Sequence, residues 1–409
     1  MIPIDIQFTQ LSLSTVLSEK KLGNVHLRFN IICKAGGNEK MKSNILVVGG
    51  YGQVGKVICT NLSAIYPGKI KCAGRNLAKA KDFALLTEGK VFPKQLDIYN
   101  IDKSDEIFND TAIVIMCLDQ KESRFVELCI EHKIHYIDIS PSYTILSEIE
   151  KLNNKAKCFG TTIVLGVGLA PGLSNLLVKQ SKIQFDHIKE VDMYLMLGIG
   201  ERHGRDGVEW LLNNLNTNFY SFENGYPKLF TSFSDGKRTK LSSKHGIRTA
   251  YRFDLADQHI VQKTLEIESV SSRFCYDSTI ATSAIARLKR LGIFRLLKIT
   301  FIRSVFISVL EGVLSIFQRL HIGTDAYAVK AEVKGIKNGK GVIVQTSIYG
   351  KNNTEITGRV ASFVADRLIK NKYPKGIFFI EQLFELDDLL PILSKDISFN
   401  YEGTVENFV

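Results

Sequence analysis

The stretch Asn44–Leu62, with the sequence NILVVGGYGQVGKVICTNL, decides the fold of this 409-residue chain. Ile45–Val48 is a continuous aliphatic run, which is typical of a parallel strand buried on both faces. Three glycines (50, 52 and 55) then form a G-x-G-x-x-G pattern, and apolar residues recur at helical spacing as far as Ile65. Glycines at such a strand-to-helix turn allow a tight turn, close approach of a diphosphate, and close packing of the helix on the strand. The stretch therefore predicts a dinucleotide-binding turn, with the phosphates held by backbone N–H groups and the helix dipole.

The residue that selects the nucleotide is expected after the second strand, Lys69–Ala73. A site for NAD has an acidic residue about 20 residues past the glycines, where it binds the ribose 2′-hydroxyl. This chain has Arg75 in that region, within Gly74-Arg75-Asn76. A guanidinium suits a 2′-phosphate, so we expect NADP, although a solvent-exposed arginine without a ligand is the alternative.

Apolar strands and helices alternate from Asn44 to Leu165. This rhythm predicts an α/β fold with a doubly wound parallel sheet, the Rossmann architecture. Ligands of such sheets lie outside the carboxyl ends of the strands. A second glycine-bearing stretch, Gly166–Gly172, either faces the same crevice or is a linker between domains. The expected cofactor-binding residues are Gly50, Tyr51, Gly52, Gln53, Val54, Gly55, Arg75, Asn76, Asp97, Leu118, Asp119 and Ser140.

The chain is long enough for two domains. Residues 41–167 are expected to form the NADP-binding domain. Residues 168–371, where hairpin turns such as Asn338-Gly339 occur, are expected to form an inserted mixed α/β domain with a largely antiparallel sheet. Residues 372–409 are expected to return to the first domain. Residues 1–40 lack the pattern of a secretory signal, and either Met41 is the natural start or this leader is a loosely ordered tail.

The amino-acid composition limits the kinds of ligand that this protein is expected to bind. The net charge is +11, but the basic residues are scattered, which favours anionic ligands over a nucleic-acid surface. The seven cysteines are widely spaced without a C-x-x-C pair or a nearby histidine pattern, so we expect a cytoplasmic, reducing environment and no structural metal.

A long apolar segment, Arg287–Leu320, contains Arg295, Lys298, Arg303 and Glu311. A membrane span needs about 20 apolar residues with few charges, so a core helix or a homodimer-interface helix is the expected structure. A basic amphipathic helix on the surface is the alternative.

Several motifs together resemble the saccharopine dehydrogenase (saccharopine reductase) family. They run in order through most of the chain after residue 41, and they are VGGYGQVG (48–55), GR (74–75), HYIDIS (135–140), GLAPGLSN (168–175), YRFDLADQH (251–259) and IGTD (322–325). The resemblance implies a Rossmann domain that carries NADP and an inserted domain that binds substrate and often mediates dimerisation. It also implies hydride transfer that joins or splits a carbon–nitrogen bond through an imine.

Such chemistry needs a proton donor for nitrogen and cations for substrate carboxylates. Histidine exchanges protons near neutral pH, so His203 and His259 are the candidate acids. Arg205 and Arg252 are the candidate carboxylate clamps, because a guanidinium binds a carboxylate through two hydrogen bonds. The alternatives are that the histidines only form turns or helix starts.

The sequence thus favours an NADP-dependent oxidoreductase that acts on a C–N bond of a carboxylated, amino-acid-like metabolite. One alternative is a non-catalytic NADP-binding regulatory or scaffold protein. Another is a peripheral membrane reductase of a lipid-like substrate, suggested only by the apolar segment near Ile293–Ile316.

Overall fold

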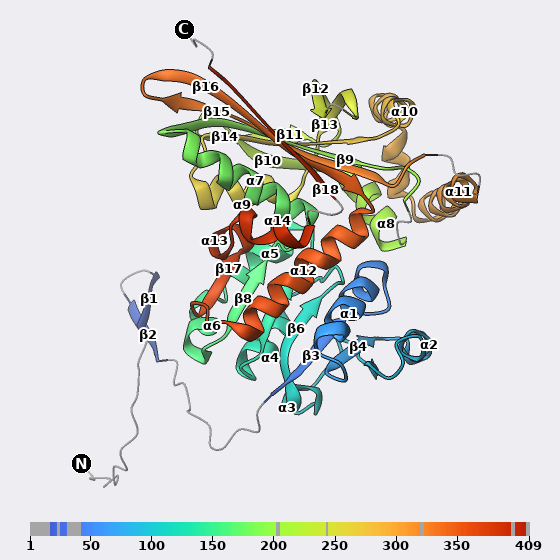
Figure 1. The fold of residues 1–409 in the computed structure, drawn as a ribbon, viewed down its shortest axis with the longest axis vertical. Coiled ribbons are helices and arrows are strands. Elements are labelled where there is room, and N and C mark those ends of the chain that lie inside the picture. Colours follow the sequence, from blue (N-terminus) through green and yellow to red (C-terminus); the bar gives the residue numbers. More distant parts are fainter. Residues whose placement is uncertain are drawn as a thin grey trace.

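The computed structural model describes residues 17–22, 25–30, 42–201, 205–242, 244–319, 323–393 and 397–405. Two seven-stranded sheets, one in each domain, organise the molecule (Figure 1). Residues 17–30 contribute a separate hairpin of two antiparallel strands, β1 (Leu17–Leu22) and β2 (Val25–Asn30).

Every strand pair of the first sheet is parallel. Its strands, in spatial order, are β17 (Gly376–Phe379), β8 (Thr162–Leu165), β7 (His135–Asp138), β6 (Thr111–Met116), β3 (Asn44–Val48), β4 (Ile70–Gly74) and β5 (Val91–Gln95). The chain starts at β3, runs outward to β5, and then crosses back to β6. The strand order therefore reverses between β3 and β6, which makes this the switch point where doubly wound sheets bind ligands. The predicted fold of this domain is confirmed.

Helices cover both faces of this sheet. Its strand β3 has apolar side chains on both faces, and each face must be buried. Ile45 and Val47 belong to one core cluster and Leu46 and Val48 to the other, and none of the four is more than 1% exposed. The helices between the strands are α1 (Gln53–Ile65), α2 (Leu77–Leu85), α3 (Ile107–Asp110), α4 (Arg124–Glu131), α5 (Tyr143–Glu150) and α6 (Asn153–Phe159).

The second sheet is mixed and largely antiparallel, as predicted. Only the pair β14–β9 is parallel. Its order is β12 (Ser234–Ser242), β13 (Gly246–Arg252), β14 (Ser269–Tyr276), β9 (His187–Leu197), β15 (Ala326–Lys337), β16 (Lys340–Lys351) and β18 (Ile397–Val405). A two-stranded ribbon, β10 (Asn218–Glu223) and β11 (Tyr226–Thr231), stands beside it.

The helical segments of the rest of the chain lie around this sheet and between the two domains (Figure 1). They are η1 (Leu169–Leu173), α7 (Ser174–Ser181), η2 (Lys182–Gln184), α8 (Arg205–Leu215), α9 (Ala256–Leu265), α10 (Thr279–Arg290), η3 (Ile293–Lys298), α11 (Thr300–Arg319), α12 (Asn353–Lys370), α13 (Ile380–Leu383) and α14 (Leu386–Leu393).

One apolar core joins the two domains. The cluster that contains Val47 of the first sheet also contains Val191, Met193 and Leu195 of β9, which are alternate residues and so share one face of the second sheet. The segment Gly166–Gly172 lies at this junction, where η1 contacts α9 and α12. It acts here as a packed linker.

Two of the predicted domain boundaries need correction. Helix α12 was expected in the inserted domain, but it packs against α1, and a side chain at Gly358 would meet the Val57 side chain at 2.5 Å. The C-terminal part was expected to return to the first domain. Its first strand, β17, does return and pairs with β8 at the edge of the first sheet, whereas β18 pairs with β16 and extends the second sheet.

Among the described residues, no helix combines the length and the apolar character needed to cross a membrane. Five cysteines (59, 72, 117, 129 and 275) are free thiols, whereas Cys158 is disulfide-bonded. A disulfide is unusual in a reducing compartment, so the cytoplasmic location remains a prediction.

Candidate active site

The glycine turn between β3 and α1 is fixed to the neighbouring strand. Gly49 adopts a positive φ of 79°, and the N–H groups of Gly49 and Gly50 both donate to the Ala73 carbonyl, at 2.8 and 3.2 Å. Gly52 then donates to the Gly49 carbonyl at 2.8 Å and is the N-cap of α1, which has no side-chain cap. The first N–H groups of a helix have no partner within it, so those at the start of α1 can bind an anion.

Side chains do not fit at two of the three motif glycines. A Cβ atom on Gly55 would lie 2.3 Å from the Gly49 carbonyl oxygen and 2.7 Å from the Gly50 Cα atom. A Cβ atom on Gly50 would lie 2.8 Å from the Val47 carbonyl oxygen and 2.9 Å from the Cys72 sulfur. These approaches fit the dinucleotide fingerprint, in which glycine allows the helix, the strand and the diphosphate to come close.

The loop after β4 is tied to the same turn through Tyr51. The Tyr51 ring lies over Gly74, where a Cβ atom would be 2.5 Å from a ring carbon, and its hydroxyl accepts a hydrogen bond from the Asn76 N–H at 3.1 Å. Asn76 also caps α2, because its side chain accepts from the Lys79 N–H. Arg75 is exposed between these two fixed residues. Its guanidinium is therefore carried at the carboxyl end of β4, beside the glycine turn.

Asp97 follows β5 at the same edge of the sheet. Its carboxylate accepts hydrogen bonds from the Asn100 side chain and the Tyr99 N–H, and these bonds, with a smaller contribution from the positive charge of Arg75, hold its pKa below the usual value. From the other side of the switch point, Leu118 reaches the turn, because its side chain lies 2.9 Å from where a Cβ atom of Gly49 would stand. Hence the structure brings together the turn, Arg75, Asp97 and Leu118.

Asp119 and Ser140 lie next to each other at the carboxyl ends of β6 and β7. The Ser140 hydroxyl is 3.4 Å from an Asp119 carboxylate oxygen. Behind them is a buried polar cluster that was not predicted. Asp138 accepts hydrogen bonds from the Tyr136 hydroxyl at 2.8 Å, the Gln120 amide at 3.0 Å and the Ser140 N–H at 2.7 Å. Burial raises the pKa of Asp138 to about 6. The signal in the sequence was a carboxylate at the carboxyl end of a buried parallel strand.

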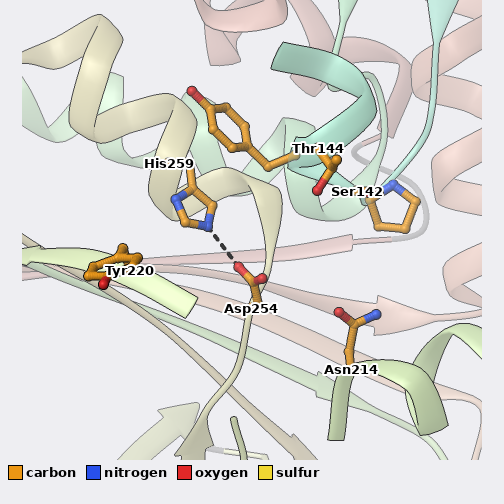
Figure 2. A pocket seen from close by; sticks show the side chains of 8 residues that line it. Ser142, Thr144, Asn214, Tyr220, Asp254 and His259 are labelled. Atoms are coloured by element: carbon orange, nitrogen blue, oxygen red, sulfur yellow. Dashed lines mark hydrogen bonds and ion pairs between the residues drawn. The ribbon is translucent and has the colours of Figure 1, made fainter. Parts of the chain in front are cut away.

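A cavity of about 320 Å³ opens directly beyond Ser140, between the first domain and the second (Figure 2). It is lined by Pro141, Ser142, Tyr143, Thr144, Asn214, Tyr220, Asp254 and His259. The first four belong to the loop after β7 and the start of α5. The other four come from α8, β10, the segment between β13 and α9, and α9 itself. Both domains therefore build one pocket at the carboxyl edge of the first sheet.

His259 makes close contacts with residues from both domains in this pocket. Its Nε2 atom lies 2.7 Å from a carboxylate oxygen of Asp254 (Figure 2). Its ring stacks on Tyr143 with centroids 4.6 Å apart. The edge of the ring also meets Phe219 of β10. An ionised carboxylate only accepts hydrogen bonds, so Nε2 carries the hydrogen in this pair, and Nδ1 is left to exchange a proton.

Of the other three predicted catalytic residues, only the side chain of Arg252 is described, and it is not part of the pocket lining. Arg252 pairs with Asp235 at 2.8 Å and Glu223 at 3.7 Å, and its guanidinium lies 3.9 Å from the centroid of the Phe230 ring. These contacts give Arg252 a structural role, and its role as a clamp remains a prediction. Arg205 begins α8, but its side chain is outside the described residues, as is the whole of His203.

Fold and glycine turn together define the class of this protein: a dinucleotide-binding protein with a Rossmann domain. Residues 45–164 match the family model described as the saccharopine dehydrogenase NADP binding domain. These residues are therefore an NADP-binding domain of the saccharopine dehydrogenase type, with NADP as the cofactor, and the resemblance predicted from the motifs is confirmed.

One of the similar solved structures shows the same fold, and two others align with lower TM-scores. The apo saccharopine dehydrogenase (L-Glu forming) from Saccharomyces cerevisiae aligns over 88% of this chain and 100% of its own, with a TM-score of 0.63 and 15% identity. The DAP dehydrogenase of C. glutamicum, in complex with DAP, aligns over 86% and 99%, with a TM-score of 0.40 and 11% identity. An engineered D-amino acid dehydrogenase bound to NADP+ aligns over 86% and 99%, with a TM-score of 0.42 and 12% identity. No curated protein sequence matches the chain.

Proposed function

We propose that this protein transfers a hydride to or from the C–N bond of a carboxylated, amino-acid-like metabolite, and that the substrate binds in the pocket around His259. The observation that carries this proposal is the position of the pocket. Its wall begins at Pro141, the residue after Ser140, so the paired His259 and Asp254 stand at the edge of the sheet where the cofactor is expected.

The first domain supplies the cofactor contacts. The N–H groups at the start of α1 are suited to the diphosphate, and the exposed guanidinium of Arg75 is suited to the 2′-phosphate. When bound, NADPH supplies the hydride and the protein supplies orientation and electrostatics. The remaining predicted contacts are Tyr51, Gln53, Val54, Asn76, Asp97, Leu118, Asp119 and Ser140.

His259 is proposed to exchange the proton of the substrate nitrogen. The Asp254 carboxylate stabilises the protonated ring and fixes which nitrogen carries the hydrogen, and the Tyr143 ring holds the plane of the imidazole. Because Tyr143 belongs to the first domain and His259 to the second, the stacking also fixes the proton donor relative to the cofactor domain.

Recognition of the substrate carboxylate is assigned to Arg205, the first residue of α8. The described lining of the pocket contains no lysine or arginine, and Arg252 already pairs with two carboxylates. Arg205 begins the helix that contributes Asn214 to the pocket and is therefore proposed as the clamp, with His203 two residues before it in the sequence.

The test is NADPH oxidation with a panel of oxo-acids combined with amines, followed by absorbance. With an accepted pair, His259→Ala is expected to lower turnover about 100-fold while NADPH affinity is unchanged. His187→Ala is the matched control, because His187 also pairs with a carboxylate, Glu268, but is half exposed on β9. Wild-type turnover in His259→Ala would remove this residue from the mechanism, and inactivity towards every pair would favour the non-catalytic alternative.

A further inference from the structure

One face of the second domain exposes an unusual number of large apolar side chains. It is formed by α10, η3 and α11, which lie in sequence and contact one another through η3 (Figure 1). We name it the α10–α11 surface. Its apolar members are 38–83% exposed, and they are Ile280, Leu291, Ile293, Leu296, Ile299, Phe301, Val305 and Val309.

These residues are arranged in stripes. On α11, Phe301, Val305 and Val309 follow one another at intervals of four, which places them on one side of an α-helix. Along η3, Ile293, Leu296 and Ile299 follow at intervals of three, which places them on one side of a helix with three residues per turn. Buried residues such as Phe294 and Ile307 face the core from the same two elements. Each element is therefore apolar on its solvent side as well as on its core side.

The same segment is strongly basic. Residues 279–319 contain seven lysines and arginines against one glutamate, a net charge of +6, whereas the whole chain of 409 residues carries +11. Arg287, Arg290 and Arg295 are exposed next to the apolar stripes. Basic and apolar side chains together on an exposed helical surface are the features of helices that lie in the plane of a membrane interface.

We propose that the α10–α11 surface docks on an anionic lipid bilayer, with its helices lying along the surface. The charge decides between this partner and a second copy of the chain. A twofold interface would place two copies of this positively charged surface against each other, and the repulsion between their like net charges disfavours association. An anionic lipid surface attracts the same arginines, and the boundary of its acyl chains accepts the apolar stripes.

A cavity at the margin of this surface fits the same partner. It has a volume of about 220 Å³ and is lined by Leu212, Asn213, Asn216, Thr217, Leu297 and Arg303. The guanidinium of Arg303 together with asparagine side chains provides hydrogen-bond donors for the phosphate of a lipid headgroup. Leu212, Asn213 and Asn214 are consecutive on α8, and Asn214 lines the pocket of His259. Docking would thus take place one helix away from the proposed active site.

The experiment measures binding of the full chain to phosphatidylcholine vesicles with and without phosphatidylserine, by flotation and by titration. We expect binding only to the vesicles with phosphatidylserine, and weaker binding as the salt concentration rises. Arg290→Gln combined with Arg295→Gln is expected to weaken binding roughly 25-fold, about fivefold for each charge removed. Phe301→Ser combined with Leu296→Ser is expected to weaken it about tenfold or more.

Matched controls test whether the effect belongs to this surface. Leu85→Ser with Leu86→Ser changes two apolar residues that are each 80% exposed in the first domain, and Lys182→Gln with Lys189→Gln removes two exposed charges elsewhere. Both controls should bind vesicles as the wild type does. NADPH titration and sedimentation velocity confirm folding in each variant. The proposal is overturned if the wild type ignores anionic vesicles, if all variants bind equally well, or if the surface variants turn a dimer into a monomer.

Discussion

Gly55→Ala tests the glycine turn most directly, because a single added methyl group meets backbone atoms there. The new Cβ atom would lie 2.3 Å from the Gly49 carbonyl oxygen, 2.7 Å from the Gly50 Cα atom and 2.9 Å from the Gly49 carbonyl carbon. Real Cβ contacts are longer, so the turn or the start of α1 must move. Overpacking of this kind costs about 1–3 kcal/mol.

The atoms that must move belong to the turn that is proposed to bind the diphosphate. If the displacement is relieved by shifting the turn, the N–H groups at the start of α1 no longer point at the phosphates. The NADPH dissociation constant should then rise roughly 5- to 150-fold, which corresponds to the same 1–3 kcal/mol. Fluorescence titration with NADPH measures the change, and thermal unfolding reports the stability of the unliganded protein.

Gly312→Ala is the control for the substitution itself. Gly312 also lies inside a helix, α11, but a Cβ atom there would have no neighbour within 4 Å. This variant should bind NADPH as the wild type does and be slightly more stable, because alanine favours helices over glycine. If Gly55→Ala binds NADPH normally and unfolds at the wild-type temperature, the close packing of the turn is not what holds the cofactor.

Three further predictions address other parts of the site. Arg75→Asp should weaken NADPH binding about 10- to 150-fold and NADH binding much less, and equal losses in parallel titrations would refute the 2′-phosphate contact. Asp254→Asn should reduce turnover about tenfold or more, because His259 loses the carboxylate that holds its ring in place; wild-type turnover in this variant would contradict the role of the pair. Burial raises the pKa of Asp138 to about 6, above the value of about 3.9 in an unfolded chain, so its contribution to stability is present near pH 4 and is lost as the pH rises through 6. The loss is on the order of 1–3 kcal/mol, and Asp138→Asn should flatten this part of the stability–pH curve in denaturant titrations.

The expected strands and the glycine turn were predictable because their information is local. A strand buried on both faces must be apolar throughout, as Ile45–Val48 is, and a turn between strand and helix at a diphosphate needs glycine. The boundaries of the domains were less predictable. The sequence of α12 shows an apolar face but does not show which element that face packs against. In the structure α12 packs against α1, and the close approach depends on Gly358, which contacts Val57, 301 residues earlier in the chain.

The candidate active site was likewise predictable only in part. His259 was predictable as a candidate from its residue type and motif, but its partner Asp254, its stacking on Tyr143 and the pocket between the domains follow from how α5 and α9 meet. Arg252 shows the opposite case. Its sequence context suggested a substrate clamp. In the structure its guanidinium instead forms ion pairs with Asp235 and Glu223 and lies over the Phe230 ring, and these three residues come from other strands.

By itself, the sequence determined the parallel sheet, the nucleotide turn and the preference for NADP, because each depends on residues that are close together along the chain. Only the tertiary structure decided which side chains share the pocket, where α12 and β18 belong, and which apolar residues of α10–α11 reach solvent. The reason is physical: local sequence specifies backbone conformation and the apolar face of an element, whereas the partner of that face is chosen by packing among elements distant in the chain.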